Sequence, residues 1–235
     1  GASGKFNSSL NFDGTDDYIE VPSADSIKMA SSLITIAAFV KFDSTKWQTI
    51  VDKRFSSSNL YWFGLSNTDN YVFFGVDSTS ISNSHNNTKL STGTWYHLVV
   101  TYNGSGGTFY VNGVADGSPS NMASIDGNDT VLRVGSESGG GTYWDGIISY
   151  VAIWNVVLTQ AEVTLLSSSK VKTMPLQIRP SNLKLFLPLD DQPDGTSGDG
   201  DIFHDRSSNA NNGTGGDGAN NANLTAKAED FFSYP

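Results

Sequence analysis

Residues 94–103 read Thr-Trp-Tyr-His-Leu-Val-Val-Thr-Tyr-Asn, and a second apolar run, Phe-Tyr-Val-Asn-Gly, follows at 109–113. Successive side chains of a β-strand point to opposite faces, so His97, Val99 and Thr101 share one face of the first run, and the apolar residues between them share the other. An Asn-Gly dipeptide ends each run. Such dipeptides adopt positive φ at little cost and join antiparallel neighbours. The stretch therefore predicts an antiparallel hairpin.

Runs of the same character recur along the chain, separated by clusters of Gly, Asn, Asp and Ser. One segment is different: Thr159 and Glu162 have the spacing of a capping box, and leucine and valine follow them. We predict an all-β chain with one short helix near 159–166. The predicted strands are 9–12, 18–21, 33–42, 48–53, 60–66, 71–76, 96–102, 107–111, 131–136, 144–153 and 184–189.

Composition restricts the kinds of partner. The 235 residues carry a net charge of -10, and 37% of them are hydrophobic and 16% charged, which is typical of a globular chain. Nucleic acid and anionic membrane surfaces would be repelled. The chain has no cysteine, which excludes disulfides and thiolate chemistry. No apolar run is long enough to predict insertion into a membrane.

Three segments resemble the laminin-G-like, concanavalin A-like lectin/glucanase family of jelly rolls. Residues 9–21, Ser-Leu-Asn-Phe-Asp-Gly-Thr-Asp-Asp-Tyr-Ile-Glu-Val, are similar to its opening strand pair, and 94–113 to its central hairpin. Residues 144–162 are similar to its last strand and terminal helix. The resemblance implies an antiparallel β-sandwich of the concanavalin A-like jelly-roll type. That fold hosts enzymes, lectins and structural modules, so it implies no single function.

A fourth segment is out of order. Residues 183–190 and 205–213 resemble the strand and loop that precede the first strand pair in this family. Either a truncated second repeat begins near Leu183, or the chain is permuted and 183–235 supplies a strand and loop to the same sandwich. We favour one sandwich over 1–235, with Gly1 and Pro235 on the same side, because an isolated strand would expose apolar surface and an unpaired edge.

Catalytic patterns are missing from the sequence. Glycosidases of this fold carry Glu-x-Asp-x-Glu along one strand, but none of the four glutamates here has an acidic residue two positions away. The chain also lacks a Gly-x-Ser-x-Gly elbow, a phosphate loop and a His-Glu-x-x-His motif. His97, in the middle of a strand, is expected to be a structural residue. We predict that the protein is not an enzyme.

Sugar binding requires aromatic faces beside amide and carboxylate groups. Period-two alternation prevents Tyr61 and Trp62 from both facing inward, and packing in the core is the alternative for each aromatic residue.

We predict a non-catalytic carbohydrate-binding, lectin-like or adhesion module with an extracellular or cell-surface location, next to other domains of a larger protein. The alternatives are a structural repeat of a surface or virion protein with no small ligand, and a diverged glycosidase. The candidate glycan-binding residues are Tyr61, Trp62, His85, Asn86, Tyr143 and Trp144.

Two turns could hold calcium, which prefers clustered oxygen ligands. The resemblance also implies a structural calcium ion, although the chain has Ser149 where the family commonly has a ligating aspartate. Ordinary Asx turns are the alternative interpretation. The candidate ligands are Asp205, Ser207, Asn209 and Asn211 in one turn, and Asp13, Asp16 and Asp17 in the other.

Overall fold

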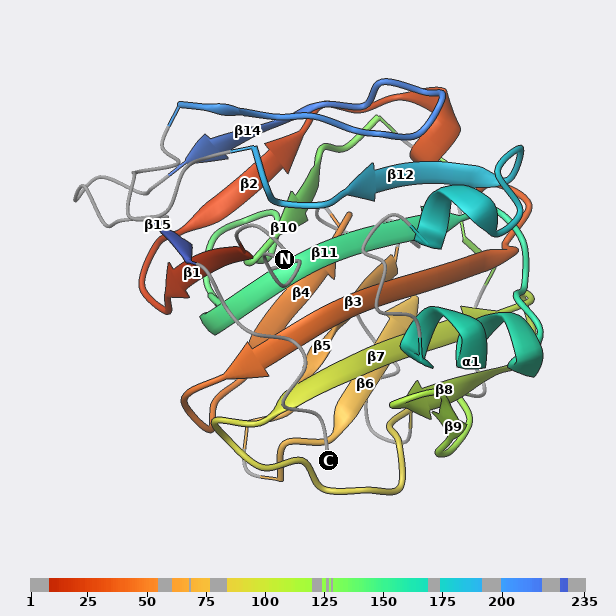
Figure 1. The fold of residues 1–235 in the computed structure, drawn as a ribbon, viewed down its shortest axis with the longest axis horizontal. Coiled ribbons are helices and arrows are strands. Elements are labelled where there is room, and N and C mark those ends of the chain that lie inside the picture. Colours follow the sequence, from red (N-terminus) through yellow and green to blue (C-terminus); the bar gives the residue numbers. More distant parts are fainter. Residues whose placement is uncertain are drawn as a thin grey trace, which may run out of the picture.

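A computed structural model shows two antiparallel β-sheets that pack face to face, with a single α-helix among the described residues (Figure 1). This confirms the predicted β-sandwich. None of the described helices is long and apolar enough to cross a membrane. The structure describes residues 9–54, 61–67, 69–76, 84–119, 124–125, 127, 129–168, 174–191, 200–216 and 225–227.

Each sheet is built from strands that are distant in sequence. Sheet A has the order β15 (Thr225–Lys227), β1 (Ser9–Asp13), β11 (Asp145–Trp154), β3 (Ile34–Phe42), β7 (Trp95–Tyr102), β8 (Gly107–Val111) and β9 (Val114–Ala115), and β12 (Leu183–Leu187) also pairs with β11. Sheet B has the order β13 (Ile202–Phe203), β14 (Gly213–Gly216), β2 (Tyr18–Val21), β10 (Leu132–Val134), β4 (Gln48–Asp52), β5 (Tyr61–Leu65) and β6 (Val72–Val76). The helical segments are η1 (Asp25–Ile27), α1 (Gln160–Ser168) and η2 (Met174–Gln177).

All the predicted strands are present, and their ends either match or differ by one or two residues. The predicted hairpin is β7–β8, and its second Asn-Gly pair takes positive φ at both Asn112 (54°) and Gly113 (79°). That turn starts the two-residue strand β9, which the sequence did not predict. The strands β13, β14 and β15 were also not predicted, because they are short and lie among Gly, Asp and Asn residues.

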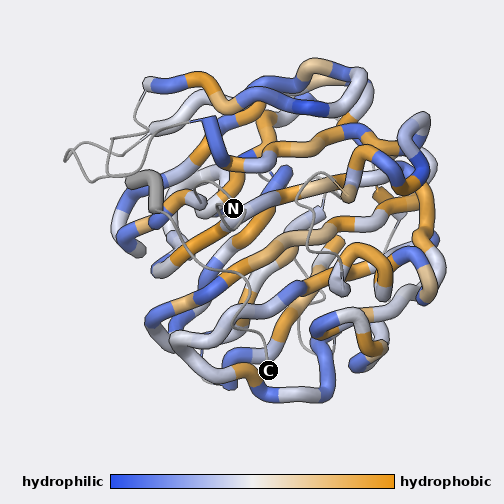
Figure 2. The backbone as a smooth tube through the Cα atoms, in the orientation of Figure 1, coloured by the Kyte–Doolittle hydropathy of each residue, from blue (hydrophilic) through white to orange (hydrophobic). Residues whose placement is uncertain are grey.

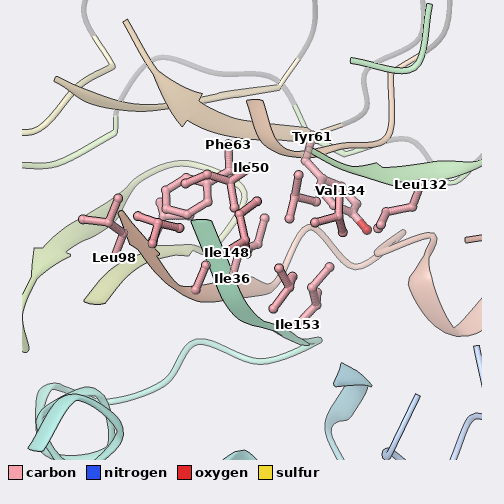
Figure 3. Close-up of a cluster of buried hydrophobic side chains, with 14 of the residues drawn as sticks. Ile36, Ile50, Tyr61, Phe63, Leu98, Leu132, Val134, Ile148 and Ile153 are labelled. Carbon is pink, nitrogen blue, oxygen red and sulfur yellow. The ribbon is translucent and has the colours of Figure 1, made fainter. Parts of the chain in front are cut away.

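The core fills the space between the two sheets (Figure 3). Alternate residues of each strand enter it, as the period-two pattern requires. Burial of this apolar surface is the main force that holds the sheets together. Side chains with no exposed surface come from sheet A, including Ile36, Leu98, Ile148 and Ile153, and from sheet B, including Ile50, Tyr61, Phe63, Leu132 and Val134.

The C-terminal segment adds strands to both sheets. β12 lies along the same edge of β11 as β1: β1 pairs with the first part of β11, and β12 with the last part. In sheet B, β14 pairs with β2, and a Cβ added at Gly213 would lie 2.5 Å from the Ile19 side chain. Glycine is therefore needed for this close approach. The predicted positions of Gly1 and Pro235 lie outside the described residues, so permutation of the chain stays a prediction.

The outer face of sheet A, called face A below, is covered by protein. The helix α1 lies over it, next to β7 and β8 (Figure 1), and hydrophobic stretches of strand run beneath the cover (Figure 2). Thr159 caps the helix: its N–H donates to Glu162 Oε2 (2.8 Å), and Glu162 N–H donates to Thr159 Oγ1 (3.3 Å). The capping box is the predicted one, and the helix extends two residues further than predicted. Buried beneath the cover are Val99, Tyr150, Trp154, Val163, Leu166, Ile178 and Phe186.

Candidate functional site

The outer face of sheet B, called face B below, carries one row of side chains across four strands. Strand register aligns Glu20 of β2 with Arg133 of β10, Arg133 with Asp52 of β4, and Asp52 with Trp62 of β5. Their apolar neighbours in sequence, such as Ile19 and the two residues flanking Arg133, lie in the core. Alternation then directs the row outward. The row places acidic, basic and aromatic groups next to one another.

One end of the row is an ion pair that rests on an aromatic ring. Arg133 donates from Nε and Nη2 to Glu20 Oε2, at 3.0 and 2.9 Å. Its guanidinium carbon lies 4.0 Å from the centre of the Tyr18 ring. Glycine is required opposite that ring, because a Cβ at Gly216 would lie 2.6 Å from it. The Arg133 side chain is 17% exposed and that of Glu20 38%, so both are within reach of a ligand.

The middle of the row is a buried carboxylate that is held by a second arginine. Asp52 has no exposed surface and accepts the Arg54 N–H (2.6 Å) and Nε–H (2.7 Å). Arg54 Nη2 lies 2.6 Å from Asp52 Oδ2 and 3.7 Å from Glu137 Oε2. Burial raises the pKa of the Asp52 carboxyl, while the Arg54 charge acts in the opposite direction. The Arg54 guanidinium carbon also lies 3.8 Å from the centre of the Trp62 ring.

The other end of the row is aromatic. The Trp62 indole lies against Gly75, where a Cβ would be 2.1 Å from its Nε1. Its neighbours are Phe73, at 3.8 Å between ring centres, and Trp47, at 6.2 Å. Trp62 is 3% exposed, and its Nε1–H has no hydrogen-bond partner among the residues that the structure describes. Trp47 is half-buried and forms the accessible part of this cluster.

A second aromatic pair lies beside the cluster at the edge of the sheet. His85 forms a bridge with Phe73, and its ring stacks on the half-buried Tyr71 at 4.8 Å between ring centres. The His85 side chain is exposed, and its Nδ1 lies 2.6 Å from the Asn86 carbonyl oxygen. The aromatic surface of face B therefore continues from Trp47 to this edge.

The candidate glycan-binding residues fall into different places. Trp62 and His85 lie on face B, and Tyr61 faces inward, as alternation required. Tyr61 and Trp144 have no exposed surface, because both rings are packed in the core. This corrects their assignment as sugar-contacting residues. Tyr143 is half-buried in the loop that carries Glu137.

Asn86 is also corrected, because its amide is fully used within the protein. Its Oδ1 accepts the Val72 N–H (2.8 Å), and its Nδ2 donates to the Thr88 carbonyl (2.8 Å) and to Asp116 Oδ2 (2.7 Å). The side chain has no exposed surface. Asn86 therefore fixes the edge of sheet B to the loop at Asp116.

The turn at 205–211 is held by hydrogen bonds that use both carboxylate oxygens of Asp205. Asp205 Oδ1 accepts the N–H groups of Phe186 and Ser207, and its Oδ2 accepts the Ser207 hydroxyl and the Asn211 N–H, all at 2.8 Å. Asn209 and Asn211 donate their amide N–H groups to the carbonyls of Leu183 and Lys184 in β12. These contacts correct Asp205 as a metal ligand, and they favour the alternative of Asx turns for the segment that carries Ser207, Asn209 and Asn211.

The turn at 13–17 does suit a cation. Asp13, Asp16 and Asp17 each offer a carboxylate oxygen, and these oxygens lie within 4.8 Å of one another. Asp16 and Asp17 are buried, and Asp17 Oδ2 accepts the Asp13 N–H at 2.8 Å. Lys46 donates to the Gly14 carbonyl at 2.6 Å, which fixes the turn next to the chain that carries Trp47.

The sequence did not indicate several residues of face B. Glu20 and Arg133 each lie between two core residues, which is the signal of an outward position, but only the strand register shows that they meet. Trp47 directly precedes the predicted strand 48–53, but nothing in the sequence distinguishes it from the aromatic residues of the core. The missed residues are Tyr18, Glu20, Trp47, Asp52, Arg54, Tyr71, Phe73, Arg133 and Glu137.

Face B also brings two carboxylates to the same arginine. Asp52 Oδ2 and Glu137 Oε2 lie 2.6 and 3.7 Å from Arg54 Nη2. A glycosidase also uses two neighbouring carboxyl groups. However, Asp52 is held by Arg54 and shielded from solvent, so it has no free oxygen to direct at a substrate. The contact with Arg54 therefore occupies one carboxylate of this pair.

Comparison with known proteins gives a family and a fold. A sequence model described as "Concanavalin A-like lectin/glucanases superfamily" matches residues 13–164. No curated protein sequence matches the chain. The solved structures described below are less than 25% identical to it, so they show the fold alone.

Three of these structures illustrate the likeness. A heptameric SAP-like pentraxin from Limulus polyphemus is 19% identical, with a TM-score of 0.56 over 71% of this chain and 84% of that one. A Bacteroides ovatus protein, whose carbohydrate binding is itself only proposed, is 21% identical, with a TM-score of 0.65; the match covers 97% of this chain but 61% of that one. The CBM40 module of Ruminococcus gnavus IT-sialidase, solved with α2,3-sialyllactose, is 13% identical, with a TM-score of 0.51 over 70% of this chain and 100% of that one.

Proposed function

We propose a function from the premise that this chain belongs to the concanavalin A-like lectin/glucanase superfamily: it binds carbohydrate on face B and does not cleave it. The observation that carries the proposal is the row Glu20–Arg133–Asp52–Trp62, flanked by the partly exposed rings of Tyr18, Trp47 and Tyr71. Aromatic rings stack on the apolar faces of sugars, and the neighbouring charged groups form hydrogen bonds with hydroxyls.

The likeness to carbohydrate-binding structures supports this proposal through the fold. The Bacteroides ovatus protein and the sialidase module both use a sandwich of this type. An extracellular or cell-surface location and attachment to other domains are parts of the same proposal. If the protein were a structural repeat with no small ligand, the aromatic and ionic groups of face B would have no role.

We also propose that the protein does not catalyse a reaction, because Arg54 holds the Asp52 carboxylate. Its carboxylate is held at 2.6–2.7 Å by three N–H groups of Arg54, counting the backbone and side chain together. A glycosidase needs one carboxyl group that can donate a proton and a second one that faces the sugar. We expect no reducing sugar to be released from any glycan that the protein binds, and its release by wild type but not by Glu137→Gln would favour the glycosidase alternative.

The direct test is a screen of the protein against a glycan array and a polysaccharide panel, with two matched tryptophan variants. Trp47→Ala removes a half-buried indole from face B, and Trp95→Ala removes a half-buried indole from face A. We expect the first variant to lose at least tenfold in affinity and the second to bind like wild type. If no glycan binds, or if both variants bind equally, the proposed function is wrong.

A calcium ion is the proposed cofactor. The carboxylates of Asp13, Asp16 and Asp17 would hold it, and it would supply a fixed positive charge at the turn beside Trp47. We expect calcium to raise the melting temperature of wild type and to leave Asp16→Asn unchanged, with chelator reversing the increase. Magnesium is the control, since its preference for a smaller octahedral site should give a weaker effect. Equal melting temperatures with calcium and with chelator would contradict the proposal.

A further inference from the structure

We infer that face B selects neutral glycans and rejects glycans that carry carboxylate or sulfate groups. The inference rests on the proposed function, because it names the class of glycan that the same face takes. It comes from the way in which the two arginines are held. A free arginine would attract an acidic sugar, but both arginines here already have carboxylate partners.

Each guanidinium group is neutralised within the protein. Arg133 is bonded to Glu20 through two nitrogens, at 3.0 and 2.9 Å. Arg54 is bonded to Asp52, and Glu137 lies 3.7 Å from the same guanidinium. The two guanidinium groups and the three carboxylates together carry one net negative charge when the carboxyls are ionised. An acidic sugar would have to compete with carboxylates that are already in place.

The carboxylates cannot easily give way. Asp52 is fully buried between β10 and β5, and it also accepts the Arg54 backbone N–H, so it is fixed by main-chain as well as side-chain contacts. Displacing it would leave a buried charge without its partner, which costs far more than losing an exposed pair. The Arg133 guanidinium is fixed on its other side by the Tyr18 ring.

The groups that remain suit hydroxyls. A guanidinium has several N–H donors, and the described contacts of Arg133 use only Nε and one Nη2 donor. Both of these bonds end on Glu20 Oε2, so in the described part of the chain Oε1 has no hydrogen-bond partner. A sugar hydroxyl can accept a hydrogen bond from a remaining N–H of Arg133 and donate one to Glu20 Oε1. A sugar carboxylate can only accept, and it would lie next to Glu20.

The net negative charge of the whole chain also disfavours the binding of acidic glycans. The net charge of -10 repels an anionic polymer as it approaches, although salt at physiological concentration screens this field beyond ~8 Å. Repulsion at contact range, from Glu20 and Glu137, is screened much less. Selectivity against acidic glycans should therefore persist in moderate salt.

The test compares neutral glycans with their acidic counterparts. Lactose is paired with α2,3-sialyllactose, and carboxyl-reduced polygalacturonate with polygalacturonate, within a wider panel of neutral and acidic glycans. Affinities are measured by calorimetry and affinity electrophoresis in moderate salt. We expect the neutral member of any pair that binds to bind at least tenfold more tightly. Equal or tighter binding of the acidic members would overturn the inference and leave the proposed function intact.

Glu20→Gln locates the selectivity. This variant removes the carboxylate that pairs with Arg133. We expect the affinity for each acidic member, divided by the affinity for its neutral counterpart, to increase at least fivefold. The matched control is Asp25→Asn, which removes one exposed negative charge at η1, where Asp25 pairs with Lys28. If Asp25→Asn increases acidic binding as much as Glu20→Gln does, the selectivity comes from net charge, and the assignment to face B is overturned. If no member of the panel binds, the proposed function fails and the inference fails with it.

Discussion

The outer faces of the two sheets carry similar aromatic side chains but use them differently. On face A, Trp154 Nε1 donates to the Ile178 carbonyl at 2.8 Å, and His97 Nε2 lies 2.8 Å from the Tyr150 hydroxyl. On face B, the Trp62 Nε1–H has no such partner within the described part of the chain, and the Arg54 guanidinium lies over its ring. Face A has a helix packed over it, and face B presents paired charges and partly exposed rings.

This difference separates stability from binding. Aromatic rings that are buried under α1 add apolar surface to the fold, much as a second core would. Rings that share a surface with ion pairs have hydrogen-bonding groups beside them, which a sugar needs. Substitutions on face A should therefore change the free energy of unfolding, and substitutions on face B should change affinity.

The largest expected effect is that of Trp154→Ala. Trp154 has no exposed surface and packs beneath the cover of face A, so its removal leaves a cavity and an unpaired Ile178 carbonyl. We expect a loss of about 3–5 kcal/mol in the free energy of unfolding, measured by urea denaturation. The control is Trp47→Ala on face B, which should lose less than half as much. Equal losses would remove the distinction between the faces.

The next effect depends on pH and concerns His97. Burial lowers the pKa of His97 to about 3, whereas the unfolded chain should titrate near 6.5. The unfolded state then binds the proton more readily, so this contribution to stability is complete above about pH 6.5 and is lost as the pH falls towards 3. The slope from this single group reaches about 1.4 kcal/mol per pH unit.

The stabilities of wild type and His97→Gln, compared between pH 7 and pH 4, isolate that contribution. The variant has the lower stability at pH 7 because it loses the contact with the Tyr150 hydroxyl. The difference between the two proteins should shrink as the pH falls. A difference that does not change with pH would mean that His97 is accessible to solvent, against the covered state of face A.

A smaller effect is expected from Thr159→Ala. The substitution removes the cap of α1, and we expect a loss of about 1 kcal/mol in the free energy of unfolding. Glycan affinity should not change, because α1 packs on face A. Thr159→Ser keeps the hydroxyl and serves as the control. A loss of affinity in Thr159→Ala would show that the two faces are coupled.

The smallest effect on stability is expected from Arg133→Gln. The pair with Glu20 is partly exposed, and such pairs contribute about 0–1 kcal/mol. We expect the free energy of unfolding to change by less than about 1 kcal/mol, while glycan affinity falls at least tenfold. Melting curves and binding isotherms on the same sample provide the comparison. A stability loss as large as that of Trp154→Ala would place Arg133 among the structural residues.

The sequence could predict the strands because their alternation is local. The pattern around His97 predicts β7, and Thr159 with Glu162 predicts the start of α1. The sequence could not predict β14. Its glycines become strand residues only because Ile19 and Tyr18 approach them closely. Face B was missed for the same reason: Glu20, Arg133 and Asp52 lie far apart in sequence, and pairing of distant strands brings them together.

The most direct test of the account is an NMR titration of the five tryptophan indole N–H signals with the glycan that binds most tightly in the panel. Assignment uses single tryptophan variants. The account predicts that the signals of Trp47 and Trp62 on face B move with ligand, while those of Trp154 under α1 and Trp144 in the core stay in place. Movement of the Trp154 signal with the face B signals unchanged would contradict it.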